Sequence, residues 1–298
     1  MPLWIPITVV AAILQTTRTA MQQRLRRLLS VSGAGFVRYV YGAPLSLGAI
    51  GVIALSGHDL PSPSGRFWPL TAGAGMAQII GTMLLIRAFD ARDYAIGTVY
   101  SKTEVVQVAL FSLVFLGESL RPLGWIAVVV CLAGIAILAT KGGDLGSVLR
   151  RLDDRAAVLG MGAGGCLALA AVSIRAASKS LGDDPAIIRA LVTLAVMNTI
   201  QAFVHGTYLV VREPGQLTRT IRTWRSSSVV GVLSVTGSAG WAWAMTLENA
   251  ARVRTFGQIE LLFTFAIAHF WLHERHGRRE LAASGLVAVG VIGVMIVG

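Results

Sequence analysis

The sequence predicts an all-α, polytopic membrane protein of ten transmembrane helices, arranged as two inverted five-helix repeats. Three observations support this prediction: composition, the length of the apolar runs, and a recurring pair of glutamates. The 298-residue chain is 54% hydrophobic and only 14% charged, whereas soluble domains carry about 25% charged residues. Its charges lie between apolar runs of about 20 residues, the length that a helix needs to cross a ~30 Å hydrocarbon layer. The short alternating segments of a transmembrane β-barrel are absent.

Breaks containing glycine or proline separate the apolar runs and end the predicted helices. The predicted spans are 3–21, 33–56, 68–88, 95–116, 123–140, 156–177, 186–211, 228–247, 253–272 and 281–297. The longest polar break, residues 142–155, separates a first repeat (1–141) from a second repeat (156–298). No loop is long enough to hold a separate domain.

An internal repeat is indicated by a constant offset of 156 residues. This offset aligns three pairs: Glu104 with Glu260, Glu118 with Glu274, and Gly134 with Gly290. Because each repeat has an odd number of helices, the second must enter the membrane from the opposite side. Transporters use such inverted repeats to alternate access around a site near the bilayer midplane.

Loop charges predict the orientation. The loops after helices 1, 3, 5, 7 and 9 hold 15 Lys and Arg residues, and the other loops hold 4. Cytoplasmic loops retain the excess of Lys and Arg, so we expect both termini outside the cytoplasm of a cell (inner) membrane. The net charge of +11 has the same origin. No basic segment interleaves with stacking aromatics as in a nucleic-acid surface, so membrane lipids and a small-molecule substrate are the expected partners, with no nucleic acid.

The segment Ser101–Leu138 resembles the end of an EamA repeat of the drug/metabolite transporter superfamily. The resemblance rests on "LGE" at residues 116–118, the polar turn after it, and the following helix with Gly134. The second copy, residues 257–297, keeps Glu274 and Gly290 but has His273 before the glutamate. The resemblance implies ten helices and transport of amino acids, nucleobases, sugars or other metabolites. It also implies cytoplasmic termini, which disagrees with the orientation that the loop charges predict. Family members often have a proline near the start of helices 4 and 9, and this chain has none there.

Two intramembrane glutamates are the main candidate site residues, because an ionisable group within a span is costly unless paired or hydrated. Glu104 is expected near the middle of helix 4, where Tyr100 and Gln107 share its helical face. Its counterpart Glu260 is expected in helix 9. The functional interpretation is proton or cation binding; the alternative is a structural, hydrogen-bonded carboxylic acid.

Four other residues complete the candidate substrate or proton site. Lys102 is expected to pair across the bundle or to line a cavity. Arg38 and Arg189 either contact substrate or extend to the lipid head groups. Trp241 either forms an aromatic cavity wall or packs in the core.

Four residues are expected to be structural. Glu118 and Glu274 end helices 4 and 9 and can cap the helix that follows, while Gly134 and Gly290 occupy matching positions of helices 5 and 10. The motifs of metal sites, nucleotide loops and hydrolytic enzymes are absent, so we predict no catalytic residues, no metal and no cofactor.

Two functions remain open at this point. The first is a secondary transporter of a small polar metabolite, an amino acid or related compound, working by alternating access and in the direction of export, with possible proton coupling through an intramembrane glutamate. The alternative is a lipid flippase or a membrane-embedded enzyme acting on an amphiphile. A ten-helix bundle with its own cavity can work as a monomer or a weak homodimer.

Overall fold

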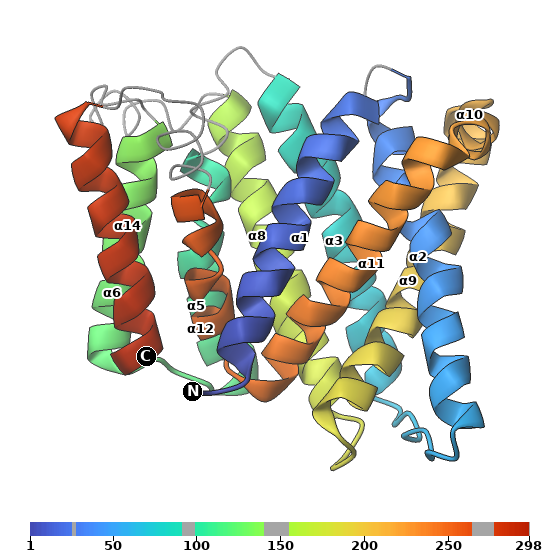
Figure 1. The fold of residues 1–298 in the computed structure, drawn as a ribbon, viewed down its shortest axis with the longest axis horizontal. Coiled ribbons are helices and arrows are strands. Elements are labelled where there is room, and N and C mark those ends of the chain that lie inside the picture. Colours follow the sequence, from blue (N-terminus) through green and yellow to red (C-terminus); the bar gives the residue numbers. More distant parts are fainter. Residues whose placement is uncertain (26–27, 91–98, 140–154, 264–276, 298) are drawn as a thin grey trace. The chain divides into compact units, whose positions relative to one another are not determined.

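The computed structural model describes residues 1–25, 28–90, 99–139, 155–263 and 277–297, and within these ranges the chain is helical without strands (Figure 1). Seven described helices are long and apolar enough to cross a membrane. Of the other three predicted spans, helix 5 is a shorter apolar helix, Pro122–Leu138. Helix 1 forms as α1, Trp4–Leu25, but is not among the seven. The part of predicted helix 9 from residue 264 onward lies outside the described residues. The protein is a multi-pass membrane protein.

The chain folds into two compact units, and each unit takes helices from both sequence repeats. The first contains residues 1–79 and 173–248, and the second contains residues 80–172 and 249–298. The boundaries fall inside α3, Phe67–Asp90, inside α8, Arg155–Lys179, and between Glu248 and Asn249. The compact units therefore differ from the sequence repeats, which run one after the other along the chain.

The first unit is a bundle of α1, α2 (Val31–Leu55), α9 (Ala186–Arg212) and α11 (Trp224–Leu247). It also contains the short α10 (Gln216–Arg222) and parts of α3 and α8. Helix α1 packs along α11, and α2 packs against both α9 and α11. Glycines permit these approaches: a Cβ at Gly240 would lie 2.9 Å from the Cβ of Ala11, and one at Gly231 would overlap Tyr41. Small residues at contacts are typical of packed membrane helices.

Polar contacts join the helix ends of the first unit. Glu213, which follows α9, accepts hydrogen bonds from the hydroxyls of Ser30 at 2.5 Å and Ser32 at 2.6 Å. Arg175 of α8 donates to the carbonyl oxygens of Met245, at 2.6 Å, and Glu248 at the end of α11. A helix ends with carbonyl groups that have no partner within the helix, so this guanidinium satisfies the end of α11.

The second unit contains α5 (Glu104–Leu116), α6 (Pro122–Ala139), α12 (Ala250–Phe256) and α14 (Arg278–Val297), with parts of α3 and α8. Helix α6 packs along α14, and α5 packs against α12. The two predicted structural glycines both lie at the α6–α14 contact. A Cβ at Gly134 would lie 2.7 Å from the backbone nitrogen of Val287, and one at Gly290 would lie 2.6 Å from that of Cys131. The equivalent helices of the two repeats thus approach each other at equivalent glycines.

Candidate functional site

Helices 4 and 9, predicted to be continuous, are both interrupted, and at the 156-residue offset the two interruptions overlap with a shift of one residue. In helix 4, the turn Lys102–Thr103 separates Val99–Ser101 from α5; in helix 9, the turn Gly257–Gln258 separates α12 from Ile259–Phe263. The amides of Lys102 and Gln258 each donate to the carbonyl three residues earlier, and those of Val105 and Leu261 do the same. These bonds coincide at the 156-residue offset. Such tightened turns inside a helix often mark a functional site or strain.

The break in helix 4 is held by its own side chains and by the close approach of α8. Thr103 donates its hydroxyl to the carbonyl of Tyr100 at 2.6 Å, and Gln107 donates to the Thr103 hydroxyl at 2.8 Å. On α8, a Cβ at Gly164 would lie 2.9 Å from the Ser101 carbonyl oxygen, and one at Gly165 would lie 2.7 Å from Gln107 Oε1. The two glycines therefore leave the space that the broken backbone occupies.

Two ion pairs connect the broken helices crosswise. Lys102 in the break of helix 4 donates to Glu260 Oε1 in helix 9 at 2.9 Å. Arg254 of α12 donates through Nε, at 2.6 Å, and through Nη2 to Glu104 Oε1 at the start of α5. Each glutamate is thus neutralised by a cation of the other repeat. The four side chains form the ion-pair cluster of the second unit.

Burial makes this cluster electrostatically strong. The exposed fractions of the side chains are 7% for Glu104, 14% for Arg254, 14% for Glu260 and 19% for Lys102. Away from water, an unpaired charge costs several kcal/mol, and two carboxylates with two cations sum to no net charge. Removal of any one of the four charges would therefore leave its partner without a counter-charge.

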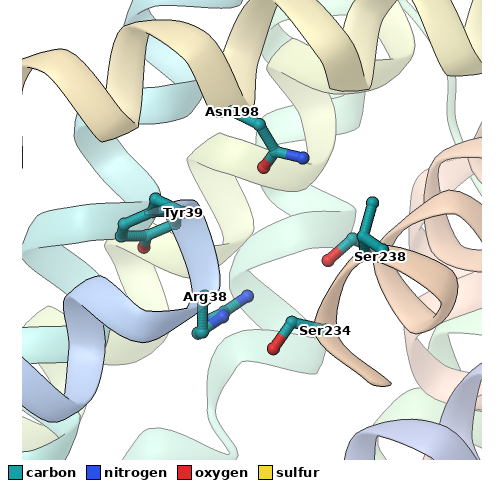
Figure 2. Close-up of a pocket in the computed structure, with 6 residues that line it drawn as sticks. Arg38, Tyr39, Asn198, Ser234 and Ser238 are labelled. Carbon is teal, nitrogen blue, oxygen red and sulfur yellow. The ribbon is translucent and has the colours of Figure 1, made fainter. Parts of the chain in front are cut away.

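A second polar feature, the pocket of the first unit, lies where α2, α9 and α11 meet. Its lining residues are Arg38, Tyr39, Asn198, Ser234, Val235 and Ser238. Figure 2 shows Asn198 and Ser238 on the side opposite Arg38, with the Ser234 hydroxyl beside the guanidinium. Asn198 is positioned by a hydrogen bond from its Nδ2 to Ser46 Oγ at 3.4 Å, and by Gly42, where a Cβ would lie 3.3 Å from Nδ2.

The structure distributes the predicted site residues between these two features. Glu104, Glu260 and Lys102 lie in the ion-pair cluster, and Tyr100 and Gln107 lie at the break of helix 4 beside it. Arg38 is 8% exposed and lines the pocket of the first unit. Glu104 lies in the first turn of α5, whereas the prediction placed it near the middle of an unbroken helix. The helical spacing that placed Tyr100 on the same face as Glu104 therefore does not apply across the break.

The remaining predicted residues lie elsewhere. Arg189 donates to the Gly182 carbonyl at 2.8 Å, in the turn before α9, and Trp241 is buried in α11. The amide of Glu118 donates to the Ser112 carbonyl at the end of α5; capping of the next helix by its side chain stays a prediction. Glu274 lies outside the described residues. Among the residues that the structure describes, no group of three or more His, Cys, Asp or Glu side chains could hold a metal ion.

Arg254 is the site residue that the sequence analysis missed. It stands next to the predicted start of helix 9, where an arginine is ordinarily interpreted as a loop or head-group cation. The helix in fact begins at Ala250, so Arg254 lies one turn inside it. The available signal was its place six residues before Glu260, in the same span as a candidate carboxylate.

The sequence pattern of the EamA-like transporter family matches residues 2–140 and again residues 155–296. The chain belongs to this family. The double match agrees with the internal repeat that the 156-residue offset indicated. It covers both broken helices and all four residues of the ion-pair cluster.

Two comparisons with single proteins extend this finding. A protein of Sinorhizobium sp. named "Uncharacterized transporter in cobO 3'region" is 35% identical over 75 residues, which are 25% of this chain and 53% of that protein. This EamA-like chain therefore spans about half the length of the curated relative it matches. A crystal structure of another protein is similar over 98% of this chain and 97% of its own, with a TM-score of 0.73 and 13% identity. That likeness establishes the fold.

Proposed function

We propose that the protein is a secondary transporter that moves a small polar metabolite, an amino acid or related compound, out of the cell by alternating access. Membership of the EamA-like transporter family supports a membrane transporter, as does the name of the Sinorhizobium relative. The observation that carries the proposal is the ion-pair cluster at the two helix breaks. Transporters of the inverted-repeat type build substrate and ion sites from discontinuous helices at the repeat interface.

The cluster provides the chemistry for a charged or zwitterionic substrate. An ammonium group can replace Lys102 or Arg254 beside a glutamate, and a carboxylate can replace a glutamate beside a cation. A zwitterion can do both and leave the total charge unchanged, so it avoids the cost of an unpaired buried charge. Protonation of Glu104 or Glu260 similarly releases its cation, which supplies a route for proton coupling. The proposed transporter works as a monomer or a weak homodimer.

Transport by the purified protein tests this proposal. Proteoliposomes loaded with a mixture of ¹⁴C-labelled L-amino acids are expected to release label faster than protein-free liposomes, and a pH gradient across the membrane should change the rate. We expect Glu104→Gln to abolish the response to the gradient and to slow release about tenfold or more, since losing a buried charge partner costs several kcal/mol. Asp183→Asn, in the exposed turn before α9, is the matched carboxylate control.

Two outcomes would contradict the proposal. Unchanged, still pH-dependent release by Glu104→Gln would exclude proton coupling through this residue. Absence of release of any amino acid, together with scrambling of fluorescent lipids by the same proteoliposomes, would favour a lipid flippase instead.

We further propose an inner-membrane location with both termini outside the cytoplasm, because 15 of the loop cations follow odd-numbered helices and 4 follow even-numbered ones. Alkaline phosphatase fused after Gly298 is then expected to be active, and a fluorescent protein that matures only in the cytoplasm should stay dark at the same position. The reverse pattern would place the termini inside and would mean that the loop charges do not set the orientation.

A further inference from the structure

We propose that the pocket of the first unit is a binding subsite for the carboxylate group of a small metabolite, with Arg38 as its cationic anchor. The inference deepens the proposed function and rests on it, since the group it binds would belong to the transported compound. The subsite shares no residue with the ion-pair cluster, because all its lining residues belong to α2, α9 and α11.

Arg38 is placed as an interior cation. It is the eighth residue of α2, which begins at Val31, and it is 8% exposed. A chain of eight helical residues rises about 12 Å, so Arg38 lies well inside a helix of membrane-spanning length. Intramembrane cations that face the protein interior commonly belong to substrate or ion pathways.

Two buried hydroxyl groups around Arg38 lack a hydrogen-bonding partner among the described residues. They are the hydroxyls of Tyr39 and Ser234, residues that are 2% and 3% exposed. Burying a hydroxyl without a partner costs about 1–3 kcal/mol, so two such residues in the lining of one pocket favour a bound molecule that supplies the partners. Ser238 adds a third hydroxyl, one turn along α11 from Ser234 on the same face.

The chemistry of the lining specifies a carboxylate. Every polar side chain in the pocket can donate a hydrogen bond, and Arg38 is the one charged residue among the six that line it. A guanidinium binds a planar carboxylate through two parallel hydrogen bonds.

The pocket has no room for a water molecule in this conformation. A carboxylate therefore docks between Arg38 and the lining hydroxyls only when the lining side chains move apart.

A comparison of each carboxylate with its own amide tests this subsite, because the amide controls for general effects of the solute on stability. Thermal unfolding of the protein in phosphatidylcholine nanodiscs is measured at equal ionic strength for three pairs: acetate and acetamide, L-lactate and lactamide, and L-alanine and L-alaninamide. At least one carboxylate is expected to raise the unfolding midpoint by about 2 °C or more above its amide, because a ligand that binds only the folded state stabilises it. Arg38→Gln should abolish the difference, and Arg225→Gln, an exposed arginine at the start of α11, should retain it.

Further variants keep the test decisive if Arg38→Gln fails to fold. Arg38→Lys keeps the charge but loses the planar fork, and Tyr39→Phe and Ser234→Ala each remove one hydroxyl; all three should reduce the carboxylate shift. A shift that persists in these variants, or no difference between any carboxylate and its amide, would overturn the proposal. So would a shift produced by adding phosphatidylglycerol to the nanodisc and by no soluble carboxylate.

The same variants separate this inference from the proposed function. Equal release of a carboxylate-bearing compound by the wild type and Arg38→Lys, without an Arg38-dependent carboxylate shift, would leave the transporter standing and remove the subsite. An Arg38-dependent carboxylate shift without any release would leave the subsite standing and remove the transporter.

Discussion

Arg254→Gln is expected to lower the free energy of unfolding by about 3–5 kcal/mol, because it leaves the carboxylate of Glu104 buried without its cation. Glu104 is 7% exposed and both Nε and Nη2 of Arg254 bond to one of its oxygens. The double variant Glu104→Gln/Arg254→Gln removes both charges, so it should cost clearly less than the sum of the two single variants. Unfolding in mixed micelles, followed by tryptophan fluorescence, measures the three differences.

The other ion pair is the internal comparison. Lys102 and Glu260 are 19% and 14% exposed, so partial hydration should make Glu260→Gln less costly than Glu104→Gln. Additive effects of Glu104→Gln and Arg254→Gln would mean that the two side chains are not coupled in the folded protein, and the crossed arrangement of the cluster would then be wrong.

Gly290→Ala is expected to destabilise the α6–α14 contact by about 1–3 kcal/mol or more, the range for overpacking a close contact. The new Cβ would lie 2.6 Å from the backbone nitrogen of Cys131 and 2.7 Å from the carbonyl oxygen of Ala127. Backbone atoms cannot rotate away, so the two helices must separate. Thermal unfolding in detergent, and the yield of folded protein after purification, measure the effect.

Gly285→Ala is the matched control on the same helix. A Cβ at Gly285 meets nothing within 4 Å, and alanine favours a helix over glycine by about 0.5–1 kcal/mol. Gly285→Ala should therefore be neutral or slightly stabilising. Equal unfolding temperatures for the two variants would show that α6 and α14 are not in close contact at Gly290.

Much of the fold could be predicted because a bilayer constrains the sequence strongly. Apolar runs long enough to span, separated by glycine and proline, located most of the helices, and the 156-residue offset located the repeat. The interruptions of helices 4 and 9 could not be predicted in the same way. Lys102–Thr103 is not a helix-breaking pair, and the break depends on Gly164 and Gly165 of α8, residues about 60 positions away.

The candidate site was predicted in part for a similar reason. A carboxylate within an apolar run stands out by its cost, which identified Glu104 and Glu260. Its partner does not stand out when it lies near a helix end, and Arg254 was therefore missed. The pocket around Arg38 depends on Asn198 of α9 and on Ser234 and Ser238 of α11, polar residues that are unremarkable in isolation.

The sequence by itself determined that the chain spans a membrane, that it contains an internal repeat, and that two glutamates lie within apolar runs at equivalent positions, because each property follows from hydropathy and spacing along one chain. The tertiary structure alone decided which charges meet. The crossed pairs join residues 150 and 158 positions apart, and the pocket needs three helices packed at close range. Such encounters are set by how glycines let helices approach, which linear spacing does not encode.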